Sequence, residues 1–123
     1  MAHQDDIQLE IAPRFRINAG RRFAFGPGKA ELLEHIGATG SIREAAAAME
    51  MSYMRAWSIV KSLDRAFAEP LVVKTRGGTT GGGAQLTETG REVLRLFREI
   101  EAATEKAIRA PVARLEALIN RKP

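Results

Sequence analysis

The segment from Ser41 to Thr87 constrains the fold of this chain more than any other. In order, it contains a run with helical character, a short turn, a second amphipathic run, and a glycine-rich loop between two short apolar stretches. Two helices joined by a tight turn and followed by a β-hairpin are typical of a winged helix-turn-helix, a unit that reads duplex DNA. We therefore predict a mainly α-helical domain with a small β component.

The first helix of the pair is expected to begin after Ser41. Residues 41–44 fit a capping box, in which the Ser41 hydroxyl accepts from the backbone N–H of Glu44 while the Glu44 carboxylate reaches back. The alanines at 45–48 favour a helix and leave a surface that another helix can approach closely. Residues 50–52 supply the turn, and Ser52 is expected to cap the next helix.

The second helix of the pair is expected at about 52–67. Its core stripe has helical spacing and consists of Ala56, Val60, Leu63 and Phe67. Trp57 adjoins this stripe, and we expect it to pack there. The remaining face is polar or basic towards the N-terminal end, where recognition helices contact base edges in the major groove.

Arg55 is the best candidate for reading a base. Its guanidinium can pair bidentately with guanine, which is worth about 1–3 kcal/mol of discrimination. We expect phosphate or mixed contacts from other polar residues of the paired helices, namely Ser41, Ser52, Tyr53, Ser58 and Lys61.

The wing is predicted from strands at 71–73 and 84–86, with the glycine-rich loop between them. Glycines keep such a loop thin, so that its backbone can approach phosphates. The expected DNA contacts of the wing are Lys74, Arg76, Gly77, Gly78 and Thr79. Residues 51–87 contain five basic and two acidic side chains, so this segment carries +3 of the net charge of +4. Such a balance is compatible with a polyanionic partner.

The flanking regions complete the predicted domain organisation. Residues 1–8 are polar and acidic and are expected to be a disordered tail, whereas 9–87 form the winged domain. Within that domain, partial alternation over 9–25 with a turn at Ala19-Gly20 indicates a strand or a short hairpin. A first helix is expected at 28–37, where apolar residues recur at helical spacing.

The third segment, residues 88–123, is predicted to be a dimerisation helix and a tail. Thr87 is expected to cap the helix, which would end near Arg109 before Pro111, and a short terminal helix would then fold back. An apolar face with heptad-like spacing predicts a homodimer. Its expected members are Val93, Leu96, Phe97, Ile100, Ala103 and Ala107.

The composition of the chain favours neither a catalytic site nor a membrane-spanning segment. The chain has two histidines and no cysteine, so we expect no enzymatic activity, no metal site and no cofactor. The glycine-rich loop lacks the Lys-Ser or Lys-Thr of a phosphate-binding P-loop. Neither a signal peptide nor an apolar run of roughly 18 residues is present, and a cytoplasmic location is therefore expected.

Several motifs together resemble one bacterial family. Ser52-Tyr53 with Ala56-Trp57, Gly81-Gly82-Gly83-Ala84 and Leu86-Thr87 are similar to the N-terminal DNA-binding domain of ModE-type molybdate-responsive regulators. The resemblance extends more loosely to the helix-turn-helix of LysR-type regulators. It implies a homodimeric repressor or activator that binds a palindromic operator of genes for molybdate transport or molybdenum metabolism.

The resemblance does not extend to a molybdate-binding domain. Only residues 111–123 follow the long helix, and a tail of that length cannot form an independent domain. We do not expect these residues to bind molybdate; a single-domain member and one part of a longer chain both fit the pattern. Two alternative functions stay open: a winged-helix protein-interaction module, and a small oxyanion sensor that uses the glycine loop as an anion nest.

Overall fold

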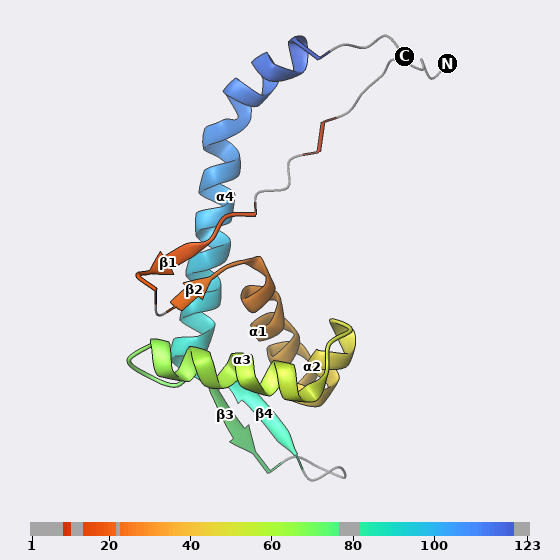
Figure 1. Cartoon of the computed structure of the whole chain (residues 1–123), viewed down its shortest axis with the longest axis vertical. Helices are drawn as coiled ribbons and strands as arrows, with labels where there is room; N and C mark the ends of the chain where they lie inside the picture. The colour runs from red at the N-terminus through yellow and green to blue at the C-terminus, as the bar shows by residue number, and fades with distance from the viewer. Residues whose placement is uncertain (1–8, 11–13, 22, 77–81, 120–123) are drawn as a thin grey trace, which may run out of the picture. The chain divides into compact units, whose positions relative to one another are not determined.

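The computed structural model describes residues 9–10, 14–21, 23–76 and 82–119. Its elements follow one another along the chain as shown in Figure 1: β1 (Ile17–Ala19), β2 (Phe23–Phe25), α1 (Pro27–Thr39), α2 (Ile42–Ala48), α3 (Tyr53–Ala66), β3 (Val72–Thr75), β4 (Gly83–Leu86) and α4 (Glu88–Ala117). Each strand pair is antiparallel. This arrangement confirms the predicted winged helix with an N-terminal hairpin and a long C-terminal helix.

Residues 14–97 form one compact unit, which contains the core. The largest fully buried side chains come from α1, from α3 and from the start of the wing, and they are Leu32, Leu33, Ile36, Leu63 and Leu71. Burial of each such side chain stabilises the fold by about 1.5–3 kcal/mol. The predicted stripe of α3 is confirmed at Ala56, Val60 and Leu63, while Phe67 is half-buried at its C-terminal end.

An aromatic cluster attaches the β1–β2 hairpin to this core. The ring of Phe97 lies 5.3 Å from that of Phe15 and 5.1 Å from that of Phe25, centroid to centroid. The ring of Phe67 lies 5.3 Å from that of Phe23 in an edge-on arrangement. Such pairs contribute about 0.5–1.5 kcal/mol each beyond the area that they bury. The hairpin is therefore fixed to α4 and to the end of α3.

The N-cap of α2 follows the prediction in one half only. The Ser41 hydroxyl accepts from the backbone N–H of Glu44 at 3.1 Å, as expected. The backbone N–H of Ser41, however, donates to Thr39 Oγ1 at 3.3 Å, so the expected return contact from Glu44 is wrong. The cause is Gly40, whose left-handed φ of 71° turns the chain so that Thr39 lies over the start of α2.

Hydrogen bonds lock the base of the wing to α3 and α4. The backbone N–H of Leu71 donates to Asp64 Oδ1 at 3.1 Å, and that of Thr87 donates to the Leu71 carbonyl at 2.9 Å. The Thr87 hydroxyl donates to the Pro70 carbonyl at 2.7 Å and accepts from the Gly90 N–H at 2.9 Å, which confirms it as a cap. The start of β3 and the end of β4 are thus held at fixed points.

Helix α4 is continuous from Glu88 to Ala117 and contains Pro111. The expected end near Arg109 and the separate terminal helix are therefore wrong. A proline removes one backbone donor and costs about 3 kcal/mol inside a helix, which is the basis of the expectation. Here good helix formers on both sides of Pro111 carry the helix through it.

Candidate nucleic-acid interface

The N-terminal half of α3 presents an exposed face next to a buried one. Ser52 caps the helix, and its hydroxyl accepts from the backbone N–H of Arg55 at 3.1 Å. Ala56 is buried against α2, whose Ala45 and Ala46 are buried as well, so small side chains let the two helices pack closely as predicted. The side chains of Arg55 and Ser58 are exposed on the other face. Packing of α2 against α3 therefore fixes the direction in which this polar face points.

Two cations stack on aromatic rings along α3. The guanidinium of Arg43 lies 4.6 Å from the centre of the Tyr53 ring, and Lys61 Nζ lies 5.3 Å from that of Trp57. Such contacts contribute about 0.5–1 kcal/mol at exposed sites and orient both partners. Sequence reasoning missed Arg43, because it belongs to α2; the signal that marks it is a basic residue in the first turn of the helix that packs on α3.

The wing supplies cations from a second element. Strand β3 pairs with β4 so that Val72 lies opposite Leu86 and Lys74 opposite Ala84. Val72 and Leu86 are buried, whereas Lys74 and Arg76 are exposed beyond the core. Figure 1 shows α3 lying across the compact unit with this hairpin extending from one side of it.

The structure places the predicted DNA-contacting residues as follows. Exposed side chains belong to Ser52, Arg55, Ser58, Lys74 and Arg76, and half-buried ones to Ser41, Tyr53 and Lys61. Gly77, Gly78 and Thr79 lie outside the described residues. The exposed members lie at the N-cap and along the exposed face of α3, and at the end of β3 and just after it, so none of them requires a rearrangement of the core.

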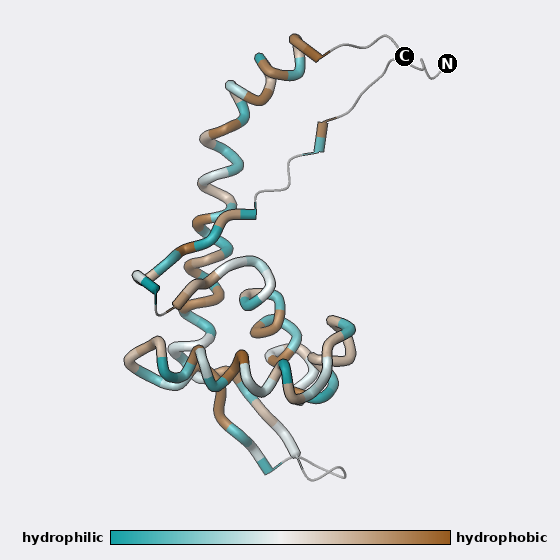
Figure 2. The backbone as a smooth tube through the Cα atoms, viewed as in Figure 1, coloured by the Kyte–Doolittle hydropathy of each residue, from teal (hydrophilic) through white to brown (hydrophobic). Residues whose placement is uncertain are grey.

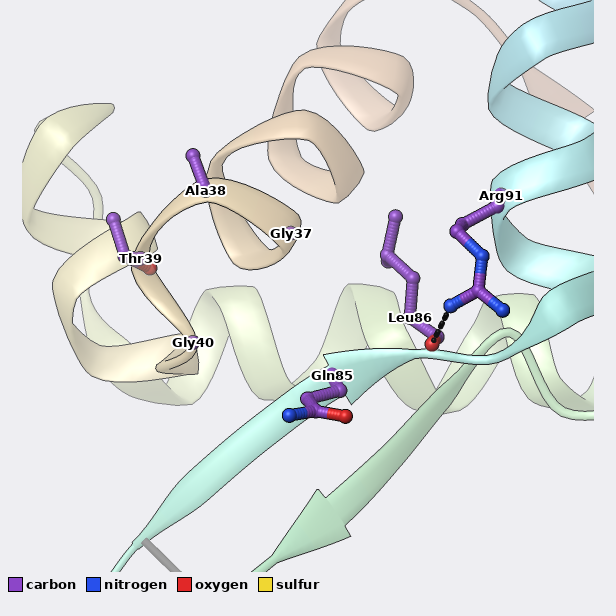
Figure 3. Close-up of a pocket in the computed structure, with 7 residues that line it drawn as sticks. All are labelled: Gly37, Ala38, Thr39, Gly40, Gln85, Leu86 and Arg91. Carbon is purple, nitrogen blue, oxygen red and sulfur yellow. Dashed lines mark hydrogen bonds between the residues drawn. The ribbon is translucent and has the colours of Figure 1, made fainter. Parts of the chain in front are cut away.

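A groove of about 360 Å³ lies where the end of α1 meets β4 and α4 (Figure 3). Its lining includes Gly40, Gln85 and Arg91. Arg91 Nη1 donates to the Leu86 carbonyl at 2.9 Å, so this guanidinium satisfies the carbonyl of the last residue of β4. The backbone N–H of Ala84 donates to the Gly40 carbonyl at 2.9 Å, which ties β4 to the turn before α2. These contacts position the wing relative to the paired helices.

Within the described ranges no helix is both long and apolar enough to cross a bilayer. The same ranges contain no group of three or more acidic, histidine or cysteine side chains that could hold a metal ion.

Comparison with known proteins decides the family. The model of the bacterial regulatory helix-turn-helix proteins of the lysR family matches residues 28–91, which is more than half of the chain. The chain belongs to this family. The match runs from α1 through the wing to the first turn of α4, so it includes every described residue of the candidate interface.

Curated relatives share the ModE or Mop names. The chain is 38% identical over 85 residues to the molybdenum transport protein ModE of Azotobacter vinelandii, covering 69% of the chain and 32% of that protein. It is 40% identical over 83 residues to the molybdenum-pterin-binding protein MopA of Rhodobacter capsulatus, covering 68% and 31%. It is 33% identical over 101 residues to the DNA-binding transcriptional dual regulator ModE of Escherichia coli K12, covering 82% and 38%.

The chain therefore spans about a third of the length of these relatives. Its helix-turn-helix is ModE-like and of the LysR type, which confirms the resemblance identified from the Tyr53 to Trp57 motif and the glycine-rich wing.

Proposed function

We propose that this chain is a sequence-specific DNA-binding transcriptional regulator of the ModE type. The observation that supports this most directly is the exposed polar face of α3 with Arg55, beside a wing that carries Lys74 and Arg76, in a helix-turn-helix of a regulatory family. A neutral docking face would not need cations from two separate elements. Duplex DNA, with a charge on every phosphate, does favour them.

In this proposal α3 enters the major groove and the wing contacts the adjacent backbone. Arg55 pairs with a base edge, while Tyr53, Ser58 and Lys61 contact phosphates or sugars. Ser41 and Ser52 contribute through the N-termini of the two paired helices. The wing adds Lys74 and Arg76 together with Gly77, Gly78 and Thr79.

We propose further that two copies of the chain pair along α4 and that the resulting dimer binds a palindromic operator. Figure 2 shows apolar residues recurring along this helix. Leu96 and Ile100 are 43% and 40% exposed, and Ala103 and Ala107 continue the stripe at intervals of three or four residues. To read such an operator, a pair joined along this stripe must present its two recognition helices about 34–36 Å apart, which is one turn of the duplex.

Two members of the predicted dimer face, Phe97 and Val93, are left out of the proposed one because they pack within their own chain. Phe97 is only 2% exposed and stacks on Phe15 and Phe25 of its own chain, so it is not available to a second copy. Val93 is half-buried and packs against the same core. The proposed face therefore consists of the exposed residues of the stripe: Leu96, Ile100, Ala103 and Ala107.

The names of the relatives point to the regulated genes. They include a molybdenum transport protein and a molybdenum-pterin-binding protein, so we propose that the controlled promoters serve molybdate transport or molybdenum metabolism. We do not propose molybdate binding by the described residues.

Replacing Arg55 with alanine should weaken binding to a specific duplex by about 1–3 kcal/mol, or roughly 5–150-fold. The specific duplex is obtained by selection from a random pool, and a shuffled duplex measures non-specific binding by fluorescence anisotropy. The loss on the shuffled duplex should be much smaller, since Arg55 is assigned to a base. Arg65→Ala, an exposed arginine in the last turn of the same helix, is the matched control. Equal losses on both duplexes would assign Arg55 to a phosphate.

Replacing Arg43 with methionine should remove both a positive charge and the stack on Tyr53, and it should lower duplex affinity several-fold. Arg43→Lys keeps the charge but not the planar stack, so it should recover only part of the loss. Tyr53 is the only tyrosine of the chain, which makes its ring signals in NMR spectra of the free protein a direct readout. Unchanged ring signals in the methionine variant would contradict a positioning role for Arg43.

A further inference from the structure

The β1–β2 hairpin bears a concentration of positive charge that the helix-turn-helix does not account for. Residues 11–30 contain five basic side chains and no acidic one. Among the described residues of this stretch, Arg14, Arg16 and Arg21 are exposed. None of these three forms a hydrogen bond or an ion pair with another described residue. The charge of the hairpin is therefore not compensated within the described part of the chain.

Packing holds these arginines on a rigid support. Phe15 lies between Arg14 and Arg16, Phe23 and Phe25 belong to the returning strand β2, and the rings of all three contact those of Phe67 or Phe97. Phe15 is half-buried through its contact with Phe97, whereas its neighbours Arg14 and Arg16 are exposed. A fixed basic face presents its charges without a large cost in conformational entropy on binding.

Like charges also meet at the root of the hairpin. Lys29 Nζ donates to the Ala24 carbonyl and lies 4.9 Å from the centre of the Phe23 ring. Partial burial and, second, the nearby Arg16 lower the pKa of Lys29. The fold thus keeps Arg16 close to another cation, an arrangement that an anionic partner would relieve.

The hairpin and the wing flank the recognition helix. Phe23 and Phe25 contact Phe67, the C-cap of α3, and Figure 1 shows β1–β2 and β3–β4 on opposite sides of α3. A helix in the major groove, about 12 Å wide, has one phosphate backbone on each side. The wing supplies cations on one side and the hairpin supplies them on the other.

We propose that the arginines of the β1–β2 hairpin form a second, sequence-independent contact with the DNA phosphate backbone, on the side of α3 opposite the wing. This inference rests on the proposed DNA-binding function. Charged residues on an exposed strand also protect a sheet edge from pairing with other chains, but that role belongs to the edge strand itself. Arg21 lies in the turn, outside β1.

The test compares two double variants of the full chain that lower the net charge equally. Arg16→Gln/Arg21→Gln removes charge from the hairpin, and the control Arg109→Gln/Arg114→Gln removes it from exposed positions of α4. Affinity for the selected duplex and for the shuffled duplex is measured at several salt concentrations. Circular dichroism and sedimentation velocity check that both variants keep the fold and the oligomeric state of the unmodified protein.

Each phosphate contact contributes about 0.9 to the slope of log affinity against log salt. For each bound subunit the hairpin variant should therefore lose about 2 from the slope and about tenfold in affinity near 0.15 M salt, or about 4 from the slope for a dimer on two half-sites, and the control should lose much less. An unchanged slope in the hairpin variant, while Arg55→Ala still weakens specific binding, would overturn this inference and leave the proposed function standing. Failure of the unmodified protein to bind any duplex at low salt would overturn both.

Discussion

Gly90→Ala should destabilise the protein by about 3 kcal/mol or more, a large part of the 5–15 kcal/mol that holds a typical domain together. A Cβ atom built on Gly90 would lie 2.2 Å from the Leu71 carbonyl oxygen. That oxygen cannot move freely, because it accepts from the Thr87 N–H, and the Leu71 N–H is held by Asp64. Either the start of α4 or the base of the wing must therefore shift.

Urea unfolding followed by circular dichroism measures this loss. The matched control is Gly28→Ala, since a Cβ atom on Gly28 in the first turn of α1 meets nothing within 4 Å. That substitution should be neutral or stabilising by up to about 1 kcal/mol, because alanine favours a helix more than glycine does. Similar stability of the two variants would show that the approach of α4 to Leu71 is looser than the structure indicates.

Leu96→Asp combined with Ile100→Asp should convert the proposed dimer into monomers. In the dimer, each new carboxylate would be buried between the paired helices without a cationic partner, which costs free energy. In the monomer the same carboxylates stay in solvent, so the monomer is favoured. Affinity for a selected duplex with two half-sites should then fall by about a hundredfold or more. In the dimer, binding of one subunit holds the other close to the second half-site, and separate monomers lose this effect. Analytical ultracentrifugation and anisotropy titrations measure the two effects.

The control for this prediction is Ala102→Asp. Ala102 is exposed on the same helix, about half a turn around from Ile100 at 100° per residue, so its carboxylate should stay in solvent. A duplex with one half-site should bind the Leu96/Ile100 variant as tightly as it binds one subunit of the unmodified protein. Retention of the dimer by that variant would place the subunit contact elsewhere.

Much of the fold could be predicted from local signals. Ser41, Ser52 and Thr87 act through backbone groups three residues away, so a sequence pattern of a few letters is enough to place all three caps. The stripe of α3 and the strands of the wing follow from periodicity in the same way. The candidate interface was predictable to the extent that it lies on these elements.

The features that were missed depend on contacts between distant segments. Arg43 is recognised only when α2 and α3 are packed, because its ring partner is Tyr53. Phe97 fits a dimer face by spacing alone, and only its stacking on Phe15 and Phe25 assigns it to the core. The error at Pro111 has a different cause. Proline usually ends a helix, but here the helix-forming residues on both sides of it keep α4 continuous.

The anchoring of the wing has a consequence for how such proteins diverge. Asp64 secures one strand, and the Gly40 carbonyl and Thr87 secure the other, so the base of the wing is held in place by contacts that lie outside the connecting loop. Insertions, deletions or new side chains between Thr75 and Gly83 can therefore accumulate without redirecting Arg55. We therefore expect related regulators with this fold to differ in the contacts that the wing makes with the DNA backbone, while the recognition helix reads the same bases.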